Sequence, residues 1–226
     1  MKKVRPTGVF TGKVSEEFGF PSAMGKSLIS GRIYLSETGL EGDEVASTQH
    51  HGGPERALHQ YPSEHYTYWR EHFGADAGWG IPGMGENLST EGMTEENVCI
   101  GDRFQWGEAV IEVSQPRSPC YKLNRRWGIE NFSVTMQEIS RCGWLYRVIT
   151  PGYVSADDEL VLVAREDNAM TIKAVCDSYF GDPLNPERLH TLREQTKLSA
   201  SWKEKVEKRL ETGEVENWNF RLLGHA

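Results

Sequence analysis

The stretch RFQWGEAVIEV, residues 103–113, contains two runs of alternating apolar residues separated by a glycine. Phe104 and Trp106 alternate with polar residues before Gly107, and a second alternating run ends at Val113. A repeat of two places one face of each run in a core, and a glycine-containing turn between two such runs is typical of a β-hairpin. This segment therefore predicts two paired strands.

Further short apolar runs lie on both sides of this hairpin. Residues 27–35, 143–154 and 159–165 each have the apolar or β-branched composition of a strand. Two segments with a helical repeat, 62–73 and 131–143, interrupt them. Many short strands with irregular connections favour a barrel or sandwich over repeated βαβ units. We expect a mainly β domain over residues 1–165.

The pattern changes to helical near residue 166. Apolar residues share one helical face in three segments, 171–181, 185–194 and 199–213. The first and third segments end at a glycine, and the second begins with Asn-Pro, both of which are typical helix boundaries. Residues 166–226 are therefore expected to form a small three-helix domain.

The composition argues against several classes of function. A net charge of -8 disfavours general binding to nucleic acid or acidic membranes, because phosphate contacts are made mainly by Lys and Arg. No apolar run approaches the roughly 20 residues of a membrane-spanning helix. Residues 1–10 carry positive charge but lack the apolar centre of a signal peptide. We expect a cytoplasmic protein that binds neither nucleic acid nor membranes.

The chain has four cysteines, too few for a disulfide scaffold and without the spacing of a structural zinc site. We interpret all four as free thiols. Cys99 and Cys176 stand beside apolar residues, and Cys142 lies in the last turn of an expected helix. Since a free cysteine behaves as a small apolar residue, these three are expected to pack in the interior.

Cys120 has different neighbours, in the segment QPRSPCYKL at 115–123. Two prolines in this segment disfavour a regular strand or helix. Arg117 and Lys122 favour the thiolate, which is the form that attacks electrophiles or binds soft metals. A packing role at the end of the preceding strand is an equally weighted alternative.

The segment HHGGPERA, residues 50–57, contains a glycine turn that allows a ligand to approach the backbone. His50, His51 and Arg56 supply donors that can hold a phosphate. A solvated turn with incidental histidines is the alternative. Metal binding by both histidines is disfavoured, because adjacent side chains diverge on a strand.

Two further candidates lie between the turn and the hairpin. His65 belongs to an aromatic-rich helical segment, where it is either a proton donor or a hydrogen-bonded packing residue. Glu86 and Asn87 follow flexible glycines in GMGENLST, residues 83–90, as site residues or as part of an ordinary turn.

Several segments taken together resemble the MOSC domain, the fold named for the C-terminus of molybdenum-cofactor sulfurases. They are LEGDE (40–44), HHGGPERA (50–57), YPSEHYTYW (61–69), GENLST (85–90) and GDRFQWGEAVIEVSQPRSPCYKL (101–123). HGGPxR followed by QPRxPCYKL is a specific combination, whereas either motif alone is weak. With the helical tail, the resemblance extends to the YiiM branch and covers nearly the whole chain. It implies a MOSC-type β-barrel followed by three helices.

The resemblance also implies a cofactor and its contacts. The matching cysteine of the family is the proposed protein ligand of molybdenum in the molybdenum cofactor, molybdopterin, which makes Cys120 the metal ligand. The catalytic set is expected to comprise Cys120, His65 and Arg56. The residues expected to hold the cofactor are His51, Arg56, Asn87, Arg117 and Lys122.

The implied activity is reduction of N-hydroxylated compounds such as 6-N-hydroxylaminopurine, which detoxifies base analogues with electrons from a flavoprotein reductase. Two alternatives remain open. One is a carrier that binds the molybdenum cofactor without turnover. The other is a cofactor-independent thiol enzyme with Cys120 as nucleophile and a histidine as base.

Overall fold

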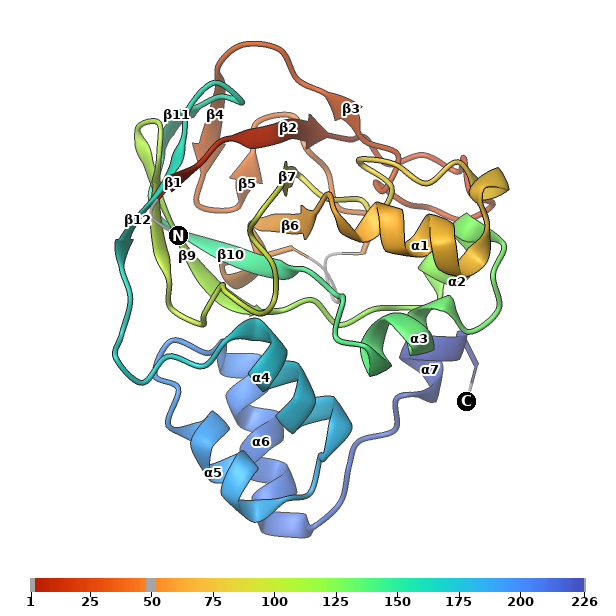
Figure 1. Ribbon diagram of the computed structural model, residues 1–226, viewed down its shortest axis with the longest axis vertical. Coiled ribbons are helices and arrows are strands. Elements are labelled where there is room, and N and C mark those ends of the chain that lie inside the picture. The colour runs from red at the N-terminus through yellow and green to blue at the C-terminus, as the bar shows by residue number, and fades with distance from the viewer. Residues whose placement is uncertain (1–2, 48–51, 226) are drawn as a thin grey trace.

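Figure 1 shows the protein as a computed structural model, which describes residues 3–47 and 52–225. Strands occupy the upper part of this view, and a group of helices lies below them. Further helices lie beside the strands, at the right of this view. The end of the chain leaves the lower group and returns to that side (Figure 1).

The strands form a curled main sheet and a small second sheet. The bounds of the main-sheet strands are β1 (Lys3–Val4), β2 (Pro6–Thr11), β3 (Ser27–Leu28), β6 (Leu58–Pro62), β7 (Leu88–Thr90), β8 (Arg103–Trp106), β9 (Ala109–Pro116), β10 (Trp144–Thr150) and β12 (Leu160–Ala164). Their order is β1-β12-β8-β9-β10-β6-β7-β2-β3. The pair β6 and β7 is parallel, whereas the other pairs are antiparallel. The second sheet has the order β11-β4-β5, with bounds β4 (Ile33–Ser36), β5 (Gly39–Leu40) and β11 (Gly152–Val154).

The predicted hairpin at 103–113 is confirmed as β8 and β9. Phe104 pairs with Ile111, and Trp106 pairs with Ala109 across the turn. All four side chains are buried, as the alternation predicts. The single strand expected at 27–35 is instead two strands in different sheets, because the chain turns at Gly31, which has a φ of 79°.

The expected β-barrel is wrong as a closed structure, because the sheet is open. Residues 3–11 supply β1, which pairs with β12, and β2, which pairs with β7. In the part of the chain that the structure describes, no ladder joins the two ends of the sheet. The strand breaks between Val4 and Pro6, since proline has no N–H and restricts the residue before it. The architecture is a curled mixed sheet with helices.

The helices have the bounds α1 (His65–Phe73), α2 (Lys122–Trp127), α3 (Phe132–Glu138), α4 (Ile172–Cys176), α5 (Pro186–Arg193), α6 (Ala200–Thr212) and α7 (Asn219–Leu223). A π-helical turn, Asp177–Gly181, continues α4, and 3-10 turns span Pro54–Arg56 and Ala75–Ala77. The three predicted C-terminal helices correspond to α4, α5 and α6, and Thr171 caps the first by accepting a bond from the Ala174 N–H at 3.1 Å. Neither α2 nor α7 was predicted from the sequence. Over the described ranges, no helix has the length and apolar character needed to cross a bilayer.

One apolar core continues from the sheet into the helical group. Trp106 and Tyr146 of the sheet belong to the same buried cluster as Val175, Trp202 and other residues of α4 to α6. A second cluster lies under α1 and α3 around Trp69. The shared core therefore fixes the helical group against the sheet, because apolar contact area between them is removed from water.

An ion pair between the buried Arg209 and the half-buried Glu216 fastens α6 to the segment that leads to α7. Arg209 donates to the Tyr179 carbonyl at 2.7 Å and pairs with Glu216 at 2.9 Å. Burial by itself would raise the pKa of Glu216, but hydrogen bonds led by that from Arg209 outweigh it and lower the pKa to about 2. This contact directs the chain after α6 back towards the sheet, where α7 meets α3 and the loop that follows β9 (Figure 1).

Candidate functional site

Cys120 lies in the loop between β9 and α2. It is half-buried, whereas Cys99, Cys142 and Cys176 are buried, as their neighbours predict. Its carbonyl accepts a hydrogen bond from the Leu123 N–H at 3.0 Å, which forms the turn into α2. The loop therefore holds one thiol at the surface, outside the apolar core.

A row of residues crosses the sheet just before this loop. On the central strand β10, Leu145 pairs with His59 of β6 on one side and with Gln115 of β9 on the other. The adjacent pair, Tyr146 and Leu58, points into the core. Because successive side chains of a strand alternate, Leu145 and His59 point to the opposite face of the sheet. Gln115 shares that face as the partner of Leu145, because the ladder is irregular between this pair and the next one, Tyr146 with Val113.

Three buried polar atoms at this place lack a protein partner. They are His59 Nε2, Gln115 Oε1 and Arg117 Nη1. Buried polar groups are nearly always hydrogen-bonded, so such a group of unpartnered atoms is a candidate ligand contact. Burial lowers the pKa of His59 well below its ordinary value and the charge of Arg117 lowers it further, although backbone groups of Gly85 and Cys142 near the ring act in the opposite direction. A neutral imidazole beside a guanidinium suits an anionic or polar ligand.

Asn87 supports this group through the backbone. Its Oδ1 accepts the His59 N–H at 3.1 Å, and its Nδ2 donates to Phe10 O at 3.2 Å and to Asp43 Oδ2 at 2.7 Å. Asp43 also forms an ion pair with the largely buried Lys26. Since protein groups use both amide donors of Asn87, this residue orients His59 and the loop around Asp43.

Glu86 is fully buried beside Asn87. Its Oε1 accepts the Tyr66 hydroxyl at 2.6 Å, and its Oε2 accepts the Met84 N–H at 2.9 Å. Burial raises the pKa of Glu86 from 4.5 to about 6, although these hydrogen bonds and the charge of Arg117 act in the opposite direction. The carboxyl group therefore titrates near neutral pH.

This raised pKa predicts a pH dependence of stability. The folded protein binds the Glu86 proton more tightly than the unfolded chain does, so this contribution is complete below pH 4.5 and is lost as pH rises through about 6. A difference of about 1.5 pKa units corresponds to about 2 kcal/mol. Free energies of unfolding in urea, measured from pH 4.5 to 7.5, should fall less steeply in Glu86→Gln than in the wild type. The exposed control Glu91→Gln should follow the wild type, and a parallel curve for Glu86→Gln would contradict the assignment.

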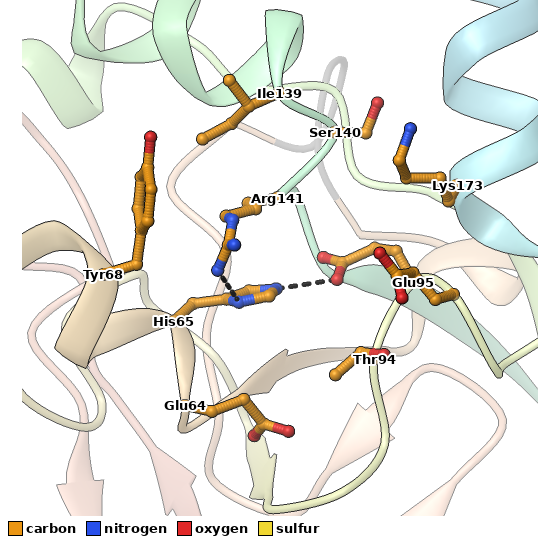
Figure 2. Close-up of a pocket in the computed structure, with 10 residues that line it drawn as sticks. Glu64, His65, Tyr68, Thr94, Glu95, Ile139, Ser140, Arg141 and Lys173 are labelled. Carbon is orange, nitrogen blue, oxygen red and sulfur yellow. Dashed lines mark hydrogen bonds and ion pairs between the residues drawn. The ribbon is translucent and has the colours of Figure 1, made fainter.

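His65 lies in a separate cavity of about 380 Å³, which Tyr68 and Lys173 also line. Arg141 Nη1 lies 3.0 Å from His65 Nδ1, and Glu95 Oε2 lies 2.7 Å from His65 Nε2 (Figure 2). Because arginine only donates, Nδ1 accepts, and the proton is on Nε2, where it is donated to the carboxylate. Cys120 does not line this cavity.

Gly143 connects this cavity with the unpartnered polar atoms. Its N–H donates to Glu95 Oε1 at 2.7 Å, and its carbonyl accepts the Arg117 N–H at 3.1 Å. Its φ is 70°, and a Cβ at this position would lie 2.3 Å from the Gln60 carbonyl oxygen and 3.1 Å from His59 Nε2. Only glycine fits this junction without displacing its neighbours.

Lys122 is placed at the start of α2, two residues after Cys120. Its Nζ donates to the Pro21 carbonyl at 3.0 Å and lies 5.2 Å from the centre of the Phe20 ring. The side chain therefore ties the cysteine loop to the segment before β3. Its expected role in cofactor binding stays a prediction.

The glycine turn at 50–57 is described only in part, because His50 and His51 lie outside the described residues. Arg56 is half-buried in the 3-10 turn that precedes β6. Ser114, the residue before Gln115 on β9, anchors this turn, since its Oγ donates to the Glu55 carbonyl at 2.6 Å. Cofactor binding by Arg56 and His51 stays a prediction.

The described residues contain no group of three or more His, Cys, Asp and Glu side chains that could hold a metal ion together. A metal at Cys120 would therefore need ligands beyond the described carboxylates, imidazoles and thiols. The unpartnered His59, Gln115 and Arg117 atoms fit a large polar cofactor that brings such ligands with it.

Sequence reasoning missed His59 and Gln115. Both are buried polar residues that stand beside another polar residue, Gln60 in β6 and Ser114 in β9, so neither stands out in the sequence. Their common face depends on the pairing of both strands with β10, which leaves no local signal.

The fold and the site together define a MOSC protein. The MOSC domain model matches residues 47–161, and the model described as the YiiM-like, 3-alpha helix domain matches residues 170–213. The chain therefore belongs to the MOSC domain family, and it is YiiM-like over nearly its full length.

Two relatives and one solved structure place it more narrowly. It is 46% identical to Protein YiiM of Escherichia coli (strain K12), covering 97% of this chain and 98% of that protein. The crystal structure of YiiM from Escherichia coli superposes with a TM-score of 0.84, covering 98% of each chain at 42% identity. A protein of Gibberella moniliformis (strain M3125 / FGSC 7600) named Reductase is 41% identical over 64% of this chain and 26% of its own length.

Proposed function

We propose that this protein is a molybdenum-cofactor-dependent reductase of N-hydroxylated compounds such as 6-N-hydroxylaminopurine. Membership of the MOSC family and a relative named Reductase support redox chemistry. The observation that carries the proposal is the half-buried thiol of Cys120, in the same loop as the unpartnered guanidinium nitrogen of Arg117. A thiolate is a suitable ligand for a soft metal, and the guanidinium is suitable for an anion.

Each residue has a distinct part in binding. The Cys120 thiolate would ligate molybdenum, Arg117 Nη1 and His59 Nε2 would contact the anionic or polar edge of the cofactor, and Gln115 Oε1 would accept a donor from it. When bound, the cofactor supplies a two-electron reduction that, with two protons, converts an N-hydroxyl group to an amine and water. A flavoprotein reductase in the cytoplasm would supply the electrons.

His65 has a positioning role in this proposal. Its proton lies between Nε2 and Glu95, and Glu95 also binds the N–H of Gly143. Gly143 in turn holds the backbone of Arg117. The pair formed by His65 and Glu95 thus orients the loop that carries the cofactor contacts.

The thiol-enzyme alternative requires a histidine within reach of Cys120. The hydrogen bonds of His65 go to Glu95 and Arg141, and among the described residues no histidine is hydrogen-bonded to Cys120. A cofactor carrier would share the same contacts, so turnover separates the carrier from the reductase.

The test uses protein purified from a host that makes the molybdenum cofactor. We expect about one molybdenum per chain by elemental analysis, and reduction of N-hydroxylated purine to the amine with a chemically reduced dye. Bound molybdenum without turnover would support the carrier. Alkylation-sensitive turnover without molybdenum would support the thiol enzyme, and finding neither metal nor turnover would overturn both the reductase and the carrier.

A further inference from the structure

One residue of the C-terminal helix α7 holds the backbone on both sides of Cys120. Arg221 Nη1 donates to the Pro119 carbonyl at 2.6 Å, and the Arg221 carbonyl accepts the Tyr121 N–H at 2.8 Å. These are the two peptide groups that flank the Cα of Cys120. Fixing both restricts the two backbone dihedrals that direct its side chain.

The guanidinium of Arg221 is itself held from several directions. Its Nη2 donates to Gln137 Oε1 of α3 at 2.7 Å. Its centre lies 5.7 Å from the Phe180 ring and 5.9 Å from the Trp218 ring, within the range of cation–π attraction. Over residues 3–47 and 52–225, no carboxylate lies within 4.0 Å of it, so its charge is not cancelled by a described ion pair.

The rest of α7 is fastened over the same loop. Asn124 Nδ2 and Ser133 Oγ donate to the Leu222 carbonyl at 3.0 and 2.7 Å. Gly224, with a φ of 83°, lies so close to Tyr121 that a Cβ would come within 2.9 Å of its ring. The helix therefore cannot shift along the loop without breaking these contacts.

We propose that Arg221 is a positioning residue for Cys120. It fixes the two peptide groups around the thiol through its side chain and its backbone, and its guanidinium places a positive charge beside the cysteine loop. Arg221 Nη1 lies 2.6 Å from the carbonyl oxygen of Pro119, the residue before Cys120, so its positive charge acts beside the cysteine. The value of this arrangement for catalysis rests on the proposed function. The arrangement itself can be tested without the cofactor.

The experiment compares alkylation of Cys120 by neutral iodoacetamide and anionic iodoacetate in full-length protein from a host that lacks the cofactor. The ratio of the iodoacetate rate to the iodoacetamide rate reports the local charge, because the amount of thiolate cancels. Removing one nearby positive charge in Arg221→Met should lower the ratio about fourfold. Arg221→Lys keeps the charge and should keep the ratio within about twofold of the wild type. The alkylated peptide identifies the modified cysteine by mass spectrometry.

If Arg221 had only a structural role, its replacement would change the protection of the loop from deuterium exchange but would leave the alkylation ratio unaltered. Deuterium uptake by the 117–124 peptide should rise in both Arg221 variants, because lysine cannot reproduce the forked contact with Pro119 and Gln137. Arg193→Met, which removes an exposed arginine of α5, should leave uptake and ratio at the wild-type values.

An unchanged ratio in folded Arg221→Met would overturn the proposal. If that variant fails to fold, Arg221→Gln, which also removes the charge, decides by the same ratio: a lowered ratio supports the proposal, and an unchanged ratio overturns it. A lowered ratio in Arg221→Met, together with wild-type protein that binds no molybdenum in a cofactor-producing host, would support this inference and overturn the proposed function. Failure of this inference and failure of the proposed function are therefore distinguishable.

Discussion

Cys120→Ser should reduce the molybdenum content of purified protein at least tenfold and abolish reduction of N-hydroxylated purine. A serine hydroxyl stays protonated and is a hard ligand, whereas a thiolate is soft and charged. Elemental analysis and the dye-linked assay measure the two effects. The free energy of unfolding should change by less than about 1 kcal/mol, because Cys120 is half-buried in a loop and its backbone bonds remain.

Cys99→Ala is the matched control for this variant. Cys99 is also a free thiol, but it is buried and belongs to the packed interior near α4. Its replacement should lower stability by about 1 kcal/mol and leave the molybdenum content unaltered. Full molybdenum occupancy in Cys120→Ser would disprove the ligand assignment even if catalysis were lost.

Gly143→Ala should destabilise the protein by about 3 to 5 kcal/mol, from backbone strain and overpacking together. The new Cβ would lie 2.3 Å from the Gln60 carbonyl oxygen, which belongs to a neighbouring strand and cannot rotate away. Relief of this clash requires separation of β10 from β6, and that movement would displace both His59 and Arg117. Urea unfolding measures the loss of stability, and molybdenum content should fall with it.

Gly213→Ala separates the two causes of this loss. Gly213 follows α6 with a φ of 66°, similar to that of Gly143, but a Cβ there would meet no atom within 4 Å. This control should lose only the roughly 1–2 kcal/mol of a left-handed alanine and retain molybdenum. Equal losses in the two variants would show that steric conflict at Gly143 is absent.

Local sequence patterns were sufficient for many elements of the fold. The hairpin at 103–113 and the three C-terminal helices follow from repeats of two and 3.6 residues, and helix caps such as Thr171 mark their boundaries. The open sheet could not be predicted in this way. It depends on Val4 and Pro6 lying in strands that pair with distant partners, and pairing between distant segments leaves no local repeat.

The candidate site likewise combines residues that local sequence indicates with residues that only long-range packing brings in. Cys120 and Arg117 attract attention because charged residues and prolines replace the apolar neighbours of a buried cysteine. His59 and Arg221 do not, since a histidine in a strand and an arginine near the chain end are ordinary in isolation. Their contacts arise when segments about 60 and 100 residues from the cysteine loop pack against the strands and loop around it.

The short terminal strands of the open sheet also bear on self-association. The edge strands, β1 and β3, are each two residues long, and Lys3 on β1 forms an ion pair with Glu159 of its own chain at 3.0 Å. Amyloid-like growth needs a longer run of unpaired backbone as a template, and charged lysines at a margin oppose it. In the described part of the chain, the edges of the open main sheet therefore provide little template for the addition of strands from another molecule.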